Sequence, residues 1–256
     1  MNNLNTYHKL PILDGLELLH ANRHTLDFPY HTHTTFNIAL ILNQPFNTKL
    51  TDKFLQAPAG TLSITNPHEV HATPCDSKAG NSFFTFYVSP DVLKELNNGS
   101  DVFFRDKIIY DEVLFKDFRF ISLHLNDPFA NTEKQLRSCL QRLVSGYAAG
   151  ENFKYREINL FRSFIEEDLS DKFSLTATAA RFGIDKFKFL RLFKHETGLT
   201  PNNYLILKRI EKSKQLLSVH DDLTGIAVEA GFYDAPHLCR HFKRFTGVTP
   251  LEYRNA

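Results

Sequence analysis

The sequence predicts an α+β chain of more than one domain, with a β-rich N-terminal part, connecting helices and an all-α C-terminal part. Short β-prone runs separated by Pro, Asn and Gly turns fill the chain to about residue 127, and helical periodicity takes over after Pro128. The last part contains a repeat, because Phe193–Tyr204 (FKHETGLTPNNY) returns 49 residues later as Phe242–Tyr253 (FKRFTGVTPLEY). A period of this length is typical of two copies of one supersecondary unit.

The β-rich part has three clear strand candidates. Phe36–Leu42 is a continuous apolar run, Thr61–Ile64 alternates, and Phe83–Val88 is rich in β-prone residues. Each run ends at a turn that contains Asn, Ser or Pro, a pattern that predicts a small sandwich or barrel. A short helix should follow from Asp91, its expected N-cap, to Asn97.

Two helices should connect the β-rich part to the repeat. Between Asn131 and Ala149 five residues form one apolar stripe at helical spacing, namely Leu136, Leu140, Leu143, Val144 and Tyr147. Asn131 or Thr132 can cap the start, and Gly150 suits the end. The stripe either packs on the β-rich part or pairs with a second copy of the chain. Another helix is expected from about residue 155 to 169.

The first copy of the repeat predicts a helix-turn-helix unit. Ser174 caps a short helix, Leu175–Phe182, Gly183 turns the chain, and Asp185 caps a second helix that runs to Thr197. In this second helix we expect three residues to face the core, Phe189, Leu192 and Phe193. Gly198 ends it, and Thr200-Pro201 begins a longer helix to about Val219, whose basic residues we expect to be solvated: Lys208, Arg209, Lys212 and Lys214.

The second copy follows the same logic. Thr224 is expected to cap the helix Gly225–Ala230, and Gly231 turns the chain. Asp234 caps the second helix of the pair, with Pro236 in its first turn, where a missing N–H costs least. The residues expected to point inward are Leu238, Phe242 and Phe245, and those expected outside are His237, Arg240, His241, Lys243 and Arg244.

Charge favours a nucleic-acid partner for the repeated region. From Asp168 onward there are 14 Lys and Arg against 10 Asp and Glu, whereas the rest of the chain has 16 against 19. A helix in the major groove needs side chains that reach base edges and basic flanks that reach phosphates. The equivalent Arg191 and Arg240 can each pair with guanine, and Phe187 or Leu190 can contact a thymine methyl group. The full set of candidate DNA contacts is Lys186, Phe187, Lys188, Leu190, Arg191, Lys194, Pro236, His237, Arg240, Lys243 and Arg244.

At these residues the chain resembles the AraC/XylS family of bacterial transcription regulators. The resemblance spans about residues 158–254 and is carried by Leu192–Gly198, Ile226–Phe232 and Phe242–Arg254. It implies that two helices, at about 185–197 and 234–246, enter successive major grooves of double-stranded DNA, and that the protein contacts RNA polymerase. The chain departs from the family at Ala235-Pro236, where members often place polar base-contacting residues, so the second helix is expected to be the poorer reader.

Histidines mark a candidate site in the N-terminal part. His31 and His33 lie just before a strand, so in extended chain they share one face, and His68 and His71 follow the turn Asn66-Pro67. The patterns at 29–33 and 57–71 resemble the cupin barrel fused to many regulators of this family. The glutamate that follows the paired histidines in metal-binding cupin enzymes is missing here, where Phe36 and Asn37 stand.

Three interpretations of the histidines stay open. They could form a catalytic metal centre, hydrogen-bond within the barrel mouth as structural residues, or bind a small polar or anionic effector. The effector site would comprise His31, His33, His71 and Tyr87, and we expect no cofactor and no metal ligand. The resulting domain prediction is a cupin-like sensor at 1–128, a connecting and possibly dimerising helix at 129–155, and an AraC-type DNA-binding domain at 156–256.

The function predicted from these features is that of an effector-responsive, sequence-specific transcription regulator and not an enzyme. The alternatives are a metal-dependent cupin enzyme with an appended helical domain, and a constitutive DNA-binding regulator. No apolar run approaches eighteen residues, and Met1–Thr6 has neither segment of a signal peptide, so no membrane partner is expected. Cys75, Cys139 and Cys239 are odd in number and widely spaced, which fits a reducing cytoplasm.

Overall fold

The computed structural model describes residues 5–125, 131–149, 166, 169 and 173–256. The chain divides into two compact units, with the change from the first to the second after residue 155. The strand β3 (Phe28–His31) is counted with the second unit in that division, but it is hydrogen-bonded into a sheet of the first and is described there. Each unit is described by itself.

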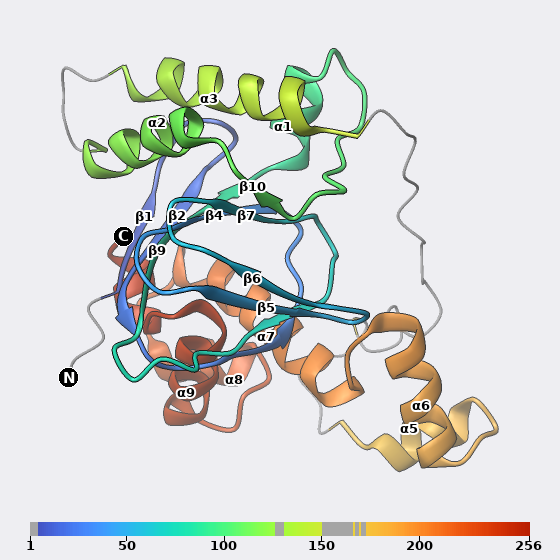
Figure 1. Ribbon diagram of the computed structural model, residues 1–256. Coiled ribbons are helices and arrows are strands. Elements are labelled where there is room, and N and C mark those ends of the chain that lie inside the picture. The colour runs from blue at the N-terminus through green and yellow to red at the C-terminus, as the bar shows by residue number, and fades with distance from the viewer. Residues whose placement is uncertain (1–4, 126–130, 150–165, 167–168, 170–172) are drawn as a thin grey trace. The chain divides into compact units, whose positions relative to one another are not determined.

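The N-terminal unit contains two sheets (Figure 1). The six-stranded sheet has the order β1 (Thr6–Lys9), β2 (Glu17–His24), β9 (Asn81–Val88), β4 (Phe36–Ile41), β7 (Leu62–Thr65) and β10 (Ile108–Ile109). The four-stranded sheet has the order β3, β8 (His71–Thr73), β5 (Phe46–Leu50) and β6 (Phe54–Ala57). The predicted β-rich fold is confirmed, although the strands form two sheets rather than a closed barrel.

Three helices cover one face of the six-stranded sheet: α1 (Pro90–Leu96), α2 (Glu112–Leu123) and α3 (Thr132–Tyr147) (Figure 1). On β4, the alternating residues Ile38 and Leu40 lie opposite Phe86 and Phe84 of β9, and all four are buried in the core beneath the helices. Burial of such side chains contributes about 1.5–3 kcal/mol each. Every residue of β4 is buried, so both faces of this strand are covered, which accounts for its largely apolar sequence.

The apolar stripe of α3 packs inside this unit. Leu136, Leu140 and Leu143 are fully buried, and the helix lies against α1 and α2. Asn131 caps the helix by accepting a hydrogen bond from the Lys134 N–H. Of the two expectations for this stripe, packing on the β-rich part is the one observed, so the stripe is not exposed to a second copy. Gly150 lies outside the described residues, as does the helix expected at 155–169 apart from residues 166 and 169.

The start of α1 differs from the expectation. Ser89, not Asp91, is the N-cap, and its side chain accepts a hydrogen bond from the Asp91 N–H. Pro90 then occupies the first helical position, where its fixed φ suits the helix and its missing N–H is not needed.

The C-terminal unit is helical throughout its described elements. These are α5 (Leu175–Arg181), α6 (Lys186–Thr197), α7 (Pro201–Leu217), α8 (Leu223–Glu229), α9 (Ala235–Thr246) and α10 (Pro250–Arg254). The contacts pair α5 with α6 and α8 with α9, and α7 contacts both α6 and α9. The predicted tandem helix-turn-helix architecture is confirmed.

The sequence repeat is a structural repeat. Thr197 and Thr246 each donate a hydroxyl hydrogen bond to the carbonyl four residues back, and the following glycines, Gly198 and Gly247, adopt φ of 74° and 82°. Glycine adopts this left-handed conformation at a lower cost than any other residue, which explains why both helices end at a glycine. The next helix then begins at Thr200-Pro201 in one copy and at Thr249-Pro250 in the other.

At Asp222, Leu192 and Arg209 the structure differs from the sequence-based expectations for this unit. Asp222, not Thr224, caps α8, because its carboxylate accepts from the N–H groups of Thr224 and Gly225. Leu192 is exposed on α6, where Phe189 and Phe193 alone supply the buried apolar positions. Arg209 is only 8% exposed, and its Nε donates to the Leu169 carbonyl at 2.9 Å. Arg209 can be buried because its stem is aliphatic and its Nε has a hydrogen-bond partner.

Candidate DNA-reading helices and a histidine cluster

The helix α6 presents a basic face to solvent. Asp185 fixes its start by accepting hydrogen bonds from the N–H groups of Phe187 and Lys188, at 2.9 and 3.0 Å. Both bonds lower the pKa of the Asp185 carboxyl, and the bond from Lys188 has the larger effect. The predicted contacts Lys186, Phe187, Lys188, Arg191 and Lys194 are all exposed, and Leu190 is partly buried. The helix therefore offers long polar side chains from its first turn onward.

An apolar residue accompanies the charges on α6. The Phe187 ring is 62% exposed, and the Lys186 ammonium lies 5.1 Å from its centroid. A ring exposed to this extent in the first turn of a capped helix is available to a base edge or a thymine methyl group. The exposure of Leu192 was not predicted from the sequence, because helical spacing places this residue near the border between the inner and outer faces of α6.

The helix α9 is built differently at its start. Asp234 accepts from the His237 N–H at 2.7 Å, and Pro236 stands in the first turn. The rings of His237 and His241 lie 4.7 Å apart and both pack against the Phe232 ring. Pro236, Arg240 and Arg244 are exposed, whereas His237, His241 and Lys243 are partly buried, so the expected outer face is narrower than the sequence indicated.

His241 is partly buried against Phe232 and His237. Burial lowers its pKa to about 4, helped by the positive charges and the second histidine around it. The ring is therefore neutral at neutral pH.

An exposed aromatic residue that sequence reasoning missed stands before α9. Tyr233 is 86% exposed, in a turn one residue longer than its counterpart, because two residues separate Gly231 from Asp234 but one separates Gly183 from Asp185. The length difference was visible in the sequence and could have identified this position.

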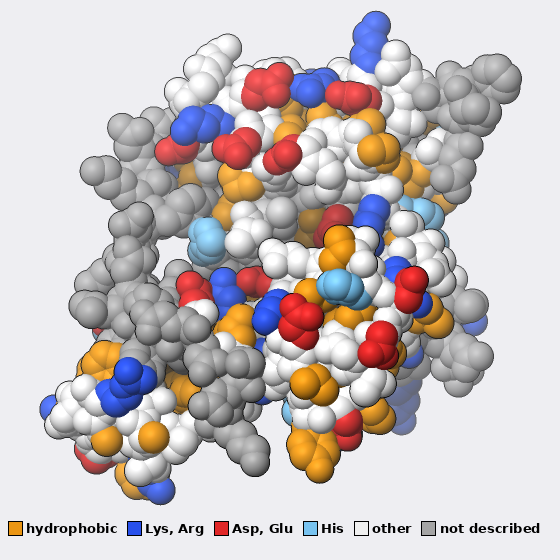
Figure 2. All heavy atoms as spheres, turned by 180° about the vertical axis from the view of Figure 1, so that it is seen from behind, with side chains coloured by type: hydrophobic (Ala, Val, Ile, Leu, Met, Phe, Trp, Pro, Cys, Tyr) orange, Lys and Arg blue, Asp and Glu red, His pale blue; other side chains and the backbone are white. Residues whose placement is uncertain are grey.

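The face of the molecule drawn in Figure 2 has no broad surface of one charge among its described residues. On the face drawn in Figure 2, Lys and Arg side chains are interspersed with Asp and Glu side chains.

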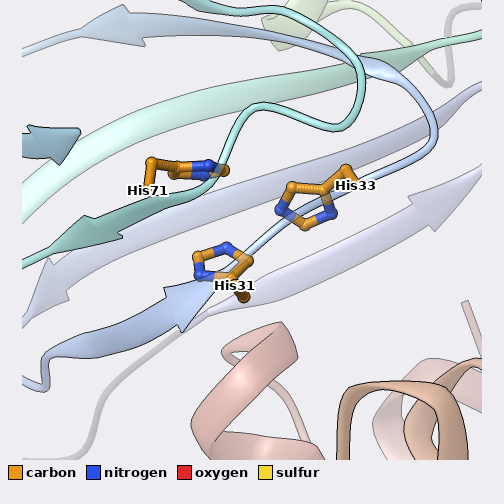
Figure 3. A group of neighbouring side chains, drawn as sticks. All are labelled: His31, His33 and His71. Carbon is orange, nitrogen blue, oxygen red and sulfur yellow. The ribbon is translucent and has the colours of Figure 1, made fainter. Parts of the chain in front are cut away.

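The N-terminal unit brings three predicted histidines together. His31 ends β3, His33 follows two residues later, and His71 begins β8, the neighbour of β3 in the sheet. Their rings point toward one another (Figure 3), and one ring nitrogen from each lies within 4.8 Å of the others. The arrangement follows from strand pairing and from the short separation of His31 and His33 in the chain.

Backbone carbonyls orient two of these rings. His31 Nδ1 donates to the Pro29 carbonyl at 2.6 Å, and His71 Nδ1 donates to the Glu69 carbonyl at 3.0 Å. Both side chains are buried, and burial lowers the pKa of His71. The His31 and His71 rings are therefore held in defined orientations.

The fourth predicted residue lies against this group. The Tyr87 ring centroid is 5.3 Å from that of His33, and the hydroxyl has its pKa raised by burial and then by the charge of Glu17. Tyr87 is therefore a neutral hydroxyl that can donate one hydrogen bond. We call His31, His33, His71 and Tyr87 the histidine cluster.

An ion pair with a buried lysine supports the loop that leads into His71. Lys107 Nζ lies 2.9 Å from Glu69 Oε2 and donates to the Phe104 carbonyl at 2.9 Å. Burial lowers the pKa of Lys107, against the opposing effect of Glu69. Neither residue was a candidate from the sequence, because Lys107 reaches this loop through the pairing of β10 with β7, which no local pattern reveals.

The architecture has counterparts among known proteins. Residues 15–152 match the AraC-like ligand binding domain, and residues 178–256 match a helix-turn-helix domain. The chain belongs to the AraC family of transcription regulators. The resemblance inferred from the repeat is thereby confirmed.

Individual relatives agree with this membership. RhaS of Escherichia fergusonii, an HTH-type transcriptional activator, is 36% identical over 100 residues, which are 39% of this chain and 36% of RhaS. YbfI of Bacillus subtilis, an uncharacterized HTH-type transcriptional regulator, is 24% identical over 225 residues, 82% of this chain and 81% of YbfI. Apo ToxT from Vibrio cholerae shares the fold with a TM-score of 0.56 at 12% identity, covering 100% of this chain and 97% of ToxT. In the described part of the chain, no helix combines the length and the apolar character that a membrane span requires.

Proposed function

We propose that the protein is a sequence-specific transcription regulator in which α6 and α9 enter successive major grooves and the N-terminal unit binds a small-molecule effector. The observation that carries the DNA-binding part is the equivalence of Arg191 and Arg240, exposed at the same position of two capped helices of one repeat. The relatives named as transcription regulators support the same role.

The two helices are proposed to contribute unequally. The first turn of α6 presents Lys186, Phe187 and Lys188 to solvent, and Arg191 follows one turn later. The first turn of α9 contains Pro236, and His237 is turned back onto Phe232. We therefore assign direct base readout to α6, while Arg240 and Arg244 on α9 bind phosphates.

A pair of arginine substitutions tests this assignment. Arg191→Ala should lower affinity for the preferred site, selected from a pool of random duplexes, by about 1–3 kcal/mol and relax one base position. Arg240→Ala should weaken selected and random duplexes alike. The control is Arg119→Ala, which removes the same charge from an exposed position of the N-terminal unit and should leave both affinities unchanged. Equal losses on selected and random DNA for Arg191→Ala would contradict base readout by that residue.

The histidine cluster is the proposed effector site. It offers imidazole nitrogens and one neutral hydroxyl that can hydrogen-bond a polar or anionic compound. An effector controls DNA binding only if it binds two states of the protein unequally. Thermal-shift screening with small polar metabolites should find a stabiliser of the full chain whose effect His33→Ala removes, whereas a regulator without an effector would show none.

Other partners belong to the same proposal. We propose that the DNA-bound protein contacts RNA polymerase, and that it acts in the cytoplasm, where the three free thiols that the structure records are stable. We propose that the N-terminal unit, which matches the AraC-like ligand binding domain, binds its ligand without transforming it. If a homodimer forms, it uses a surface other than the buried stripe of α3, and sedimentation of the full chain measures this directly.

A further inference from the structure

We propose that His31, His33 and His71 together bind one divalent first-row transition metal ion, with a position left open for water or for an anionic group of a ligand. This binding does not depend on the proposed regulatory function, since it is a property of the three side chains themselves. The use of the open position by an effector does rest on that function.

The first step is the assignment of protons on two of the rings. Carbonyl oxygens only accept hydrogen bonds, so the contacts of His31 with the Pro29 carbonyl and of His71 with the Glu69 carbonyl place a proton on Nδ1 of each ring. In a neutral imidazole the lone pair is then on Nε2. Metal-bound histidines show this same arrangement, in which a backbone carbonyl accepts from one nitrogen while the other binds the ion.

The second step is convergence. Because one nitrogen from each ring lies within 4.8 Å of the other two, some point lies within about 2.8 Å of all three. Zinc–nitrogen bonds measure about 2.0–2.1 Å, so each ring must move by less than about 1 Å. His31 and His71 are buried and hydrogen-bonded to the backbone, which leaves the partly exposed His33 as the ring that closes on the ion.

The third step is the choice of ion. Three imidazoles without a carboxylate suit Zn²⁺, Cu²⁺, Ni²⁺ or Co²⁺, whereas Mg²⁺ and Ca²⁺ require oxygen ligands. The carboxylate nearest in sequence to His71 is Glu69, which is engaged by the ammonium of Lys107 and by the Asn66 N–H. A site with three neutral ligands leaves the full charge of the ion uncompensated, so it favours an additional anionic ligand at the open position.

The test is a titration of the full chain after removal of metal with EDTA. Calorimetry with ZnCl₂ should show one ion per chain, and MgCl₂ should show no binding. His33→Ala should weaken Zn²⁺ binding by at least about 100-fold. The matched control is His124→Ala in the same unit, because His124 is exposed and its Nδ1 also donates to a backbone carbonyl, that of Phe120, but it lies outside the cluster. This control should bind Zn²⁺ as the unaltered protein does.

Cobalt supplies a second measurement. Co²⁺ bound to the unaltered protein should show visible absorption bands of low-coordinate cobalt, and His33→Ala should lose them while its circular dichroism stays unchanged. Absence of Zn²⁺ binding, or equal binding by the unaltered protein and His33→Ala, overturns the proposal. Neither result affects the proposed DNA binding, which is measured separately on the metal-free protein with the selected duplex.

Discussion

Replacing Gly231 with alanine should selectively destabilise the second helix-turn-helix unit. Gly231 turns the chain between α8 and α9 with φ of +89°, in the left-handed region that disfavours a side chain. A Cβ placed here would lie 2.0 Å from the Leu169 carbonyl oxygen and 2.8 Å from Arg209 Nε. These two atoms are hydrogen-bonded to each other, so the methyl group would enter an occupied polar contact.

The expected cost has two parts. The left-handed backbone costs alanine about 1–2 kcal/mol. Displacing the Leu169 carbonyl from the buried guanidinium removes a hydrogen bond to a charged group, which contributes about 1.5–3 kcal/mol. Gly231→Ala should therefore cost about 2.5–5 kcal/mol.

The repeat supplies a matched control. Gly183 occupies the same turn in the first unit, with φ of +65°, but a Cβ there meets nothing within 4 Å. Gly183→Ala should cost only the backbone part, about 1–2 kcal/mol. Hydrogen–deuterium exchange of the full chain, followed by mass spectrometry, compares α8 and α9 in one variant with α5 and α6 in the other. If the two variants lose protection equally, the packing of Gly231 against Leu169 and Arg209 is not what stabilises this turn.

Three further changes have directions that the structure sets. In thermal unfolding, Asp222→Ala should destabilise α8 by about 1 kcal/mol, whereas Thr224→Ala should not. A larger loss of stability for Thr224→Ala than for Asp222→Ala would identify Thr224 as the cap. Glu69→Gln leaves the Lys107 ammonium buried without its carboxylate and should lower the free energy of unfolding by about 3–5 kcal/mol. Lys107→Met should cost less, because the Glu69 carboxylate that remains is better solvated. Equal losses of stability for the two variants in denaturant titration would contradict this. His241 has a folded-state pKa of about 4, below its ordinary value of 6.5, so the unfolded chain gains the proton first and stability should fall as pH drops from about 6.5 to 4. His241→Gln should flatten that dependence in melting curves, and an unchanged slope would show that another group is responsible.

Local rules were sufficient to predict the repeated unit. The element boundaries at Asp185, Gly198 and Thr200-Pro201 depend on side chains that cap or turn the backbone within four residues. Asp234 and Gly247 repeat the same logic. These interactions are complete within a short segment, so the sequence alone reveals them.

The sequence-based predictions were wrong where two residues could both cap a helix, and where a tertiary contact determined whether a side chain is buried. Asp222 and Thr224 are both acceptable caps, and the aspartate begins the helix earlier. Arg209 was expected in solvent by its position on α7, but the carbonyl of Leu169, 40 residues earlier in the chain, buries it. Helical periodicity cannot indicate such a partner.

The histidine cluster shows the same division. The short spacing of His31 and His33 predicted that the two residues lie close together, but the addition of His71 depends on the pairing of β3 with β8. The orienting carbonyls of Pro29 and Glu69 could not be foreseen, because a ring's hydrogen bond depends on its rotamer. The residue types of the cluster could be predicted from the sequence, but the hydrogen bonds that orient the rings are seen only in the structure.

The unequal roles that we propose for the two reading helices follow from the length of one turn. One residue separates Gly183 from Asp185, whereas the extra residue after Gly231 places Phe232 inside and Tyr233 in solvent. Phe232 then holds the rings of His237 and His241, so side chains from the first two turns of α9 contribute to the interior of their own unit. The corresponding turns of α6 leave their polar groups exposed. A helix that uses its first turns for its own packing has fewer side chains left for base edges, and for this reason we assign the main reading role to α6.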